Sequence, residues 1–465
     1  MKQSSSRQIS DLSAWFALAI MVATMLYAII DRQVFFLVAA EMSSALQLSN
    51  TQLGLIQGLG FAALTFAAAY PIAWLADRFD RRWILAACIC SWALGTAACG
   101  LAGGFTTLLF AVAAVAASEA GIAPIFMAML AELFRGQARI TATMIYYVAV
   151  SLSMATGLFM GGAIIAMIQE LKPLPVLLSG FEDWRITFLL AAAPAPIFIA
   201  LVFLLPVRSL KRPSKASPGK VASSTAPIMP FLKTNLKSFG FVFAGMTFFA
   251  LGATSILAWT PVALTRSFGM NPAHVGMVLG SVIAAASVIG VLAGNFVLRF
   301  WQRRLGHRAA PRVIWVTLLI SLPLISLIPF AISPWQVFVC VGMQVVASTI
   351  AGASSVSLLQ DLAPPQIRAR VMALRAMTNG PAVGLGIAAS AALGDIIDAG
   401  PQSLFWGGVC ITVPSWIACI VLLRLAERPF ERTARASTGL EHPLDPDPDL
   451  DAVEPSLNNA LDPAR

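Results

Sequence analysis

The sequence predicts an all-α membrane protein whose twelve transmembrane helices form two six-helix pseudo-repeats. The first observation is composition, because 58% of the residues are hydrophobic, only 11% are charged and the mean hydropathy is +0.80. Charged residues make up roughly a quarter of an ordinary soluble domain, so that class is excluded. The second is a series of continuous apolar stretches, which differ from the alternating pattern of a membrane β-barrel. The third is a pair of motifs that recur in the two halves of the chain.

Each apolar stretch is on the order of 20 residues long, which an α-helix needs to cross a bilayer. In chain order we expect the spans at 13–39, 51–75, 83–103, 106–133, 141–168, 186–206, 238–264, 273–300, 312–331, 335–358, 370–396 and 403–426. A basic segment rich in Ser and Pro separates the first six spans from the last six. We therefore expect an N-terminal bundle over 1–206, a cytoplasmic linker over 207–235, a C-terminal bundle over 236–430 and a disordered acidic tail over 431–465.

The first span contains an adjacent pair of opposite charges, Asp31 and Arg32. A charge at mid-membrane depth costs roughly 3 kcal/mol on insertion scales, so it is seldom carried without a function. Neighbouring residues point about 100° apart around a helix, so the two side chains cannot fully satisfy each other. Each therefore needs a partner on another helix or in a hydrated cavity. A polar cavity inside a helical bundle is typical of a transporter.

Two motifs give the internal repeat. Glu132-Leu-x-x-x-Gln-x-Arg139 after the fourth span matches Asp361-Leu-x-x-x-Gln-x-Arg368 after the tenth span. LGLIQG at the start of the second span, from Leu53, matches VGMVLG at the start of the eighth. Both matches relate a span to the one six places later. Parallel repeats of this kind predict a binding site at the interface between the halves.

The distribution of positive charge predicts the orientation. If the N-terminus is cytoplasmic, all 31 Lys and Arg residues fall in cytoplasmic segments except Arg32, Lys172, Arg185 and Arg266. Cytoplasmic loops carry the excess of Lys and Arg, so both termini are expected in the cytoplasm. The net charge of +9 then reflects membrane topology and not a nucleic-acid partner. We expect a monomeric, multi-pass protein of the cell (inner) membrane, in contact with the lipid bilayer.

The loop after the second span carries the most recognisable motif. Its residues 73–82, Ala-Trp-Leu-Ala-Asp-Arg-Phe-Asp-Arg-Arg, resemble the Gly-x-x-x-Asp-Arg-x-Gly-Arg-Arg signature of the major facilitator superfamily, with Ala73 and Asp80 in place of two glycines. Within that superfamily the chain resembles the spinster group, through the runs IIDRQVFFLVAAEM, SEAGIAP, DWRITF and AWTPVALTRSFGMNPAHVG. The resemblance covers the chain to about residue 430. It implies the major facilitator fold and secondary active transport by alternating access.

The resemblance also implies where coupling takes place. In this fold the first and fourth spans line the cavity of the N-terminal half, which brings Asp31, Arg32 and Glu119 to the substrate and proton-coupling site. A carboxylate in a partly dry cavity can bind and release a proton as its access to solvent alternates. An arginine stays charged, so Arg32 would partner Glu119 or a substrate anion. Spinster proteins usually carry another arginine where Val112 stands here, so Arg32 is the cationic anchor expected in this half.

Two further sets of residues are expected to take part. A latch at the cytoplasmic rim, which stabilises the outward-open state, would contain Asp77, Arg78, Arg81, Arg82, Glu132 and Arg139. Aromatic side chains in a helical bundle more often serve packing, but four are candidates for lining the cavity: Tyr27, Tyr146, Tyr147 and Trp259.

Other classes of function lack their motifs. The sequence contains no HExxH or GxSxG motif for an enzyme and no P-loop for ATP, and its six cysteines and three histidines suggest no metal site. We expect no cofactor, with a proton gradient as the driving force. The sequence therefore predicts a secondary transporter of a small amphipathic or anionic organic solute, with a lysolipid-like molecule as one candidate. The alternatives are a multidrug or apolar-cation exporter and a facilitated-diffusion uniporter.

Overall fold

The computed structural model describes residues 11–173, 175, 179–205 and 228–437, and this part of the chain contains helices but no strand. In the first half the elements are α1 (Asp11–Ala45), α2 (Asn50–Gly54), η1 (Leu55–Gly60), α3 (Phe61–Arg78), α4 (Arg81–Gly100), α5 (Phe105–Leu133), α6 (Gly136–Glu170), α7 (Asp183–Ala192) and α8 (Ala195–Phe203). In the second half they are α9 (Ile228–Thr234), α10 (Leu236–Phe268), α11 (Pro272–Leu305), η2 (Gly306–Arg308), α12 (Ala309–Ser326), η3 (Ile328–Phe330), α13 (Pro334–Leu362), α14 (Pro365–Ile397), η4 (Gly400–Gln402) and α15 (Ser403–Ser437).

The described helices account for twelve membrane crossings. Eleven stretches are long and apolar enough to cross a membrane, and the longest, Pro272–Phe330, contains both α11 and α12. Gly306 ends α11 with a positive φ of 56°, a conformation that other residues avoid, and the chain turns there into α12. The second crossing joins α2, the π-helical turn η1 and α3, and the sixth is broken at Pro194 between α7 and α8.

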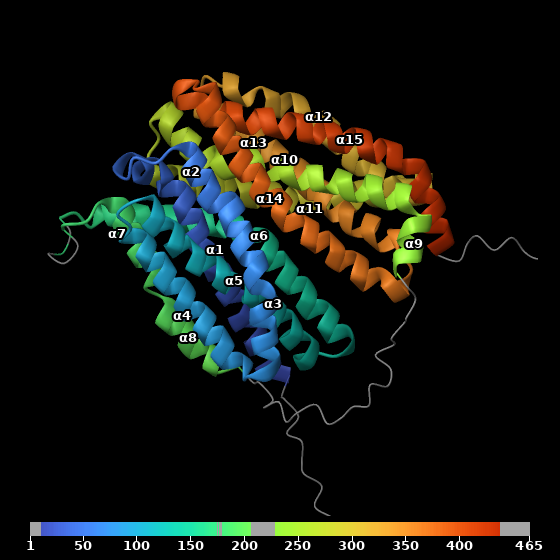
Figure 1. Ribbon diagram of the computed structural model, residues 1–465, viewed down its shortest axis with the longest axis horizontal. Helices are drawn as coiled ribbons and strands as arrows, with labels where there is room; N and C mark the ends of the chain where they lie inside the picture. Colours follow the sequence, from blue (N-terminus) through green and yellow to red (C-terminus); the bar gives the residue numbers. More distant parts are fainter. Residues whose placement is uncertain (1–10, 174, 176–178, 206–227, 438–465) are drawn as a thin grey trace, which may run out of the picture.

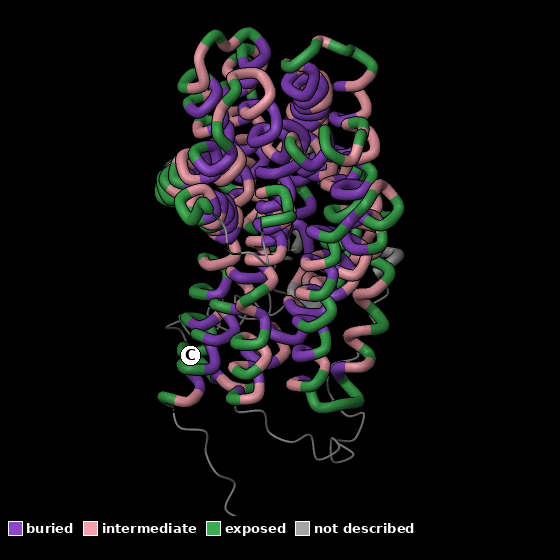
Figure 2. The backbone as a smooth tube through the Cα atoms, turned by 90° about the vertical axis from the view of Figure 1, so that its left-hand side faces the viewer, coloured by how far each residue is buried: buried purple, intermediate pink, exposed green. Residues whose placement is uncertain are grey.

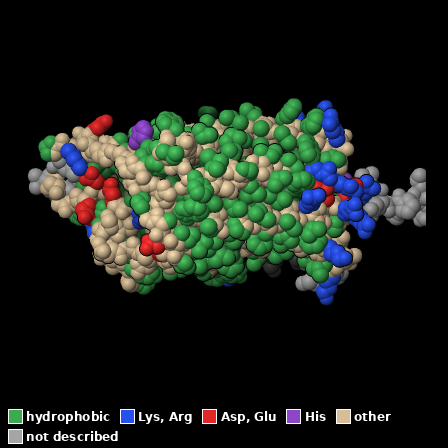
Figure 3. Space-filling model, turned by 90° about the horizontal axis from the view of Figure 1, so that it is seen from above, with side chains coloured by type: hydrophobic (Ala, Val, Ile, Leu, Met, Phe, Trp, Pro, Cys, Tyr) green, Lys and Arg blue, Asp and Glu red, His purple; other side chains and the backbone are tan. Residues whose placement is uncertain are grey.

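The helices gather in two groups, α1–α8 and α10–α15, which meet near α2 and diverge toward α9 (Figure 1). Buried residues run through the interior of each group, and exposed residues cover the outside (Figure 2). Hydrophobic side chains cover the middle of the molecule, and Lys and Arg gather at the end that carries α9 (Figure 3). This apolar band with a basic end is what a bilayer-spanning protein presents.

Close helix contacts between the two groups use glycine. A Cβ on Gly58 of η1 would lie 2.5 Å from the carbonyl oxygen of Gly384 in α14. In the same way, a Cβ on Gly276 of α11 would lie 2.7 Å from the carbonyl oxygen of Leu158 in α6. These contacts are too short for any side chain, so small residues are required where the helices cross. Gly58 and Gly276 belong to the repeated LGLIQG and VGMVLG motifs, so the sequence repeat lies at the contact between the halves.

Two ends differ from the sequence-based expectation. Helix α15 runs to Ser437, past the expected start of the tail at 431, because Glu431 is held by Arg308 and Arg435. The last part of the expected linker is helical, as α9. Most of the linker and of the tail lies outside the described residues, so the four domain limits stay predictions.

Candidate functional site

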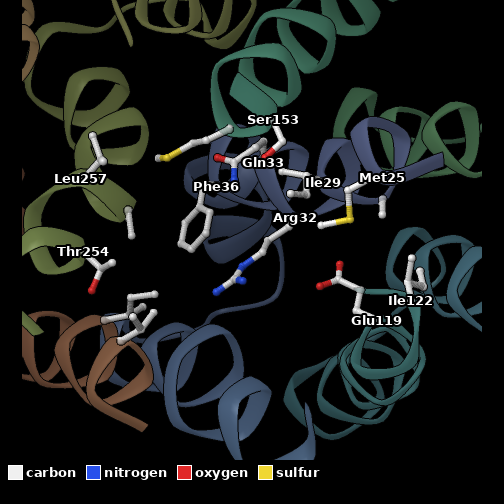
Figure 4. A pocket seen from close by; sticks show the side chains of 15 residues that line it. Met25, Ile29, Arg32, Gln33, Phe36, Glu119, Ile122, Ser153, Thr254 and Leu257 are labelled. Carbon is white, nitrogen blue, oxygen red and sulfur yellow. The ribbon is translucent and has the colours of Figure 1, made fainter. Parts of the chain in front are cut away.

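A cavity of about 360 Å³ lies between the two groups of helices (Figure 4). Its first-half wall carries the polar side chains Arg32 and Gln33 of α1, Glu119 of α5 and Ser153 of α6. Its second-half wall comes from α10 and α14 and is almost wholly apolar: Thr254, Leu257, Ala258, Val383 and Ile387. The cavity therefore has one charged side and one apolar side.

Asp31 lies behind the cavity wall, and not in the cavity. Its carboxylate accepts hydrogen bonds from Trp92 Nε1 (2.5 Å) and Thr96 Oγ1 (2.9 Å), both on α4. A third hydrogen bond comes from the backbone N–H of Arg32 (2.7 Å). The residue is only 5% exposed, so these donors replace the water that a buried carboxylate would lose. Two of the three donors to Asp31 thus come from another helix, and the three hydrogen bonds fix the position of its side chain.

Arg32 and Glu119 both line the cavity, from two different helices (Figure 4). The guanidinium of Arg32 stacks over the ring of Phe61, with 4.3 Å between its central carbon and the ring centroid. Glu119 lies halfway along α5, and its Oε1 is buried without a hydrogen-bond partner in the described part of the chain. No ion pair joins these two side chains. An anion in the cavity could therefore pair with Arg32, and a cation could pair with Glu119.

The aromatic residues expected to line the cavity do not lie on it, and this corrects the sequence-based expectation. Tyr27 is buried in the first group, where its hydroxyl donates to the carbonyl of Ala191 (2.8 Å). Tyr146 is buried against Phe126, and Tyr147 is exposed. Trp259 is buried beside the cavity: it donates to the carbonyl of Ile387 (3.0 Å) and packs edge-on against Phe36, which does line the cavity. Packing, the commoner role of aromatic residues, explains their positions.

The latch expected from the motif after the second crossing is only partly assembled. Arg81 pairs with Glu132 (2.8 Å), which ties the start of α4 to the end of α5. Arg78 stacks over Trp74 at 3.8 Å, and Arg82 donates to the carbonyl of Phe203 (3.3 Å). Two members have exposed side chains that make no hydrogen bond or ion pair with the described chain: Asp77 and Arg139.

The opposite end carries a polar cluster that the sequence did not reveal. Asp395 of α14 accepts from Asn50 Nδ2 (2.6 Å), Thr51 Oγ1 (2.6 Å) and both backbone N–H groups of these residues at the start of α2. Arg266 of α10 donates to Asn50 Oδ1 (2.6 Å) and Ser43 Oγ (2.7 Å). We call these five residues the outer cluster. Because its members come from both halves, it closes this end of the interface.

The arrangement matches a known family. A sequence model of the Major Facilitator Superfamily matches residues 16–386. The chain belongs to this superfamily. It is thus a multi-pass membrane transporter that acts on small molecules, and not an enzyme.

Individual relatives place the chain with the spinster type. It is 26% identical over 397 residues to an MFS-type efflux pump of Mycolicibacterium smegmatis, a match that covers 84% of this chain and 87% of that protein. It is 23% identical over 323 residues to Protein spinster of Drosophila melanogaster, covering 68% of this chain and half (50%) of that protein. The human spinster homolog 1 is 24% identical over 62% of this chain and 55% of its own length.

Solved structures share the fold. A bacterial homolog of the human lysosomal transporter spinster, in an inward-facing and unoccupied conformation, superimposes with a TM-score of 0.72 at 20% identity, covering 92% of this chain and 98% of that one. The nucleoside transporter NupG gives a TM-score of 0.64 at 14% identity, covering 89% of this chain and 98% of that one. The predicted fold, family and spinster resemblance are thereby confirmed.

Proposed function

We propose that this transporter is a proton-coupled carrier of a small amphipathic organic anion, with a lysolipid-like molecule as the leading candidate. The observation that carries the proposal is the asymmetry of the central cavity. Arg32 offers a positive charge on one wall, and the opposite wall is made of aliphatic side chains apart from Thr254. An acidic head group would bind Arg32 while a hydrocarbon portion lies against α10 and α14, which leaves no charge unpaired.

Proton coupling rests on the difference between the two membrane carboxylates. Both oxygens of Asp31 accept hydrogen bonds, whereas Glu119 has a buried oxygen without a partner. A buried carboxylate oxygen without a hydrogen-bond donor is costly to keep charged, and a proton on Glu119 removes that charge. We therefore assign proton binding to Glu119, anion binding to Arg32 and a fixed electrostatic role to Asp31.

The contacts between the halves support alternating access. The outer cluster joins the halves at one end, whereas each ion pair at the basic end joins helices of the same half within the described residues. With the basic end in the cytoplasm and both termini on that side of the cell (inner) membrane, this arrangement is open inward. The exposed Asp77 is then the free half of the latch that would close the cytoplasmic side in the outward-open state.

One alternative has support of its own. The uncompensated oxygen of Glu119 would also attract a cation, and the relative in Mycolicibacterium smegmatis is named an efflux pump. Export of apolar cations would then use Glu119 as the binding charge, and Arg32 would oppose binding.

Uptake into proteoliposomes separates the two functions. Purified protein is reconstituted, and a pH gradient drives accumulation of either oleoyl-lysophosphatidylglycerol, an amphipathic anion, or tetraphenylphosphonium, an apolar cation. We expect accumulation of the anion and its loss in Arg32→Gln. Accumulation of the cation alone, increased by Arg32→Gln, would contradict the proposal and establish the exporter.

A further inference from the structure

A second, much smaller cavity also lies beside Arg32, which is the lining residue that it shares with the main cavity. Its volume is about 10 Å³, and its polar lining comes from Asp31, Arg32, Gln57 and Thr96. The rest of its lining is apolar: Phe35, Phe61, Cys99, Val112, Val115 and Phe188. A cavity of roughly 10–15 Å³ is enough for one water molecule, provided that two to four polar groups surround it.

Gln57 places an unpaired acceptor beside this space. The side chain belongs to η1, is only 3% exposed, and its Oε1 has no hydrogen-bond partner in the described part of the chain. A buried amide oxygen without a partner is rare in native proteins, and an unseen water is a common explanation. π-helical turns such as η1 are frequent at functional sites.

Arg32, by contrast, has hydrogen-bond donors without acceptors. Its guanidinium carries five N–H donors, and none of them makes a hydrogen bond to the described chain. Asp31 is the neighbouring residue, but the two side chains leave the helix in different directions, and only the backbone N–H of Arg32 reaches the carboxylate. The cation and its nearest anion are therefore adjacent in sequence without direct contact between their charged groups.

We propose that one water molecule occupies this cavity and joins the three groups. It accepts a hydrogen bond from the Arg32 guanidinium and donates one to Gln57 Oε1 and one to the Asp31 carboxylate. Three hydrogen bonds are the usual number for a buried water. Gln57 is then a positioning residue, which acts through the water to hold the Arg32 guanidinium against the wall of the main cavity. This role rests on the proposed function of Arg32 as the anion anchor, but the presence of the water does not.

Gln57→Met tests for the water, because methionine has nearly the same shape and its sulfur is only a weak hydrogen-bond acceptor. If the cavity is dry, the substitution removes an unpaired buried oxygen, and the melting temperature of the purified protein stays the same or rises. If the water is present, the substitution removes one of its partners, and the melting temperature falls. A cryo-electron microscopy map of the wild-type protein that resolves ordered water should also contain density between Arg32 and Gln57.

A binding readout separates positioning from simple stability. We expect Gln57→Met to weaken the apparent affinity for oleoyl-lysophosphatidylglycerol about fivefold, the equivalent of one ordinary hydrogen bond, with the maximal exchange rate retained. Gln344→Met is the matched control, because Gln344 is also buried with an unpaired Oε1 but lies on α13, and its affinity for the anion should not change. The proposed water would be excluded by a map without density between Arg32 and Gln57. It would also be excluded by a Gln57→Met protein at least as stable as the wild type. If the wild type does not bind the anion, the proposed function fails, while the melting and density results still decide on the water.

Discussion

At the scale of single residues, the two membrane carboxylates have opposite surroundings. Asp31 is bonded by Trp92, Thr96 and a backbone N–H, and Glu119 has an oxygen with no partner. The sequence marks both as functional, since a charge inside a membrane is costly. It does not tell them apart, because the donors of Asp31 come from another helix at no recognisable spacing. The different roles follow only from the hydrogen bonds.

Removing one donor of Asp31 should destabilise the protein without touching the cavity. Trp92→Phe keeps the aromatic ring but leaves the buried carboxylate short of a hydrogen bond, at a cost of about 1–3 kcal/mol. We expect a lower melting temperature in detergent. Trp335→Phe is the control, because Trp335 is 65% exposed, and it should melt like the wild type. Equal stability of Trp92→Phe and the wild type would mean that this hydrogen bond does not hold Asp31.

At the scale of helices, the spans and the repeat could be predicted from apolar length and motif spacing. The outer cluster could not, because Asn50 and Thr51, Arg266 and Asp395 come from three separate helix ends that approach each other only in the folded bundle. The expectation that four aromatic residues line the cavity was wrong for a related reason. Composition identifies a tyrosine or tryptophan, but the helix rotation that decides between packing and cavity is set by its neighbours.

Asp395→Ala should loosen the outer end of the interface. It removes the acceptor of four hydrogen bonds that join α14 to the start of α2. Spin labels at Gln47 and Asp398, which are both exposed at this end, should gain a population at longer distance. The control Glu182→Ala breaks an ion pair at the same end but within one half, and should leave the distances unchanged. Unchanged distances in Asp395→Ala would show that the cluster does not hold the outer side closed.

Asp77→Asn should act at the other end and in the other direction. Asp77 has no partner in the described arrangement, so its loss leaves this state intact and removes a contact from the outward-open state. The equilibrium should move further toward the inward-open form, with longer distances between spin labels across the cytoplasmic ends of the two halves. Glu132→Gln, which instead breaks the pair with Arg81 inside one half, serves for comparison. A distance distribution identical to that of the wild type would exclude the latch.

At the scale of the whole molecule, the sequence predicts the family and the count of crossings because hydropathy and charge are summed over many residues. It does not predict which end of the bundle is open, because that depends on a few contacts between distant helices. The asymmetry of the cavity also needs the structure, since Thr254, Leu257 and Val383 belong to helices without charged landmarks. The proposed substrate class comes from that asymmetry.

The orientation in the membrane can be tested by labelling. Cysteine substituted at Ser179, in the loop between the fifth and sixth crossings, should react with a membrane-impermeant reagent added to intact cells. Cysteine at Ser214, in the expected linker and outside the described residues, should react only after the membrane is opened. The positive-inside distribution is the physical basis of this expectation. The reverse pattern of labelling would invert the topology and place the basic end outside.

The central claim is that a proton on Glu119 drives transport. The most direct measurement is accumulation of oleoyl-lysophosphatidylglycerol in proteoliposomes under a pH gradient, compared with exchange of the same molecule without a gradient. Glu119→Gln fixes the site in a neutral form, so we expect accumulation to be lost while exchange continues. Asp31→Asn should reduce both activities, since Asp31 holds Arg32 and not the proton. Accumulation at the wild-type level in Glu119→Gln and Asp31→Asn alike would contradict proton coupling and leave facilitated diffusion as the mechanism.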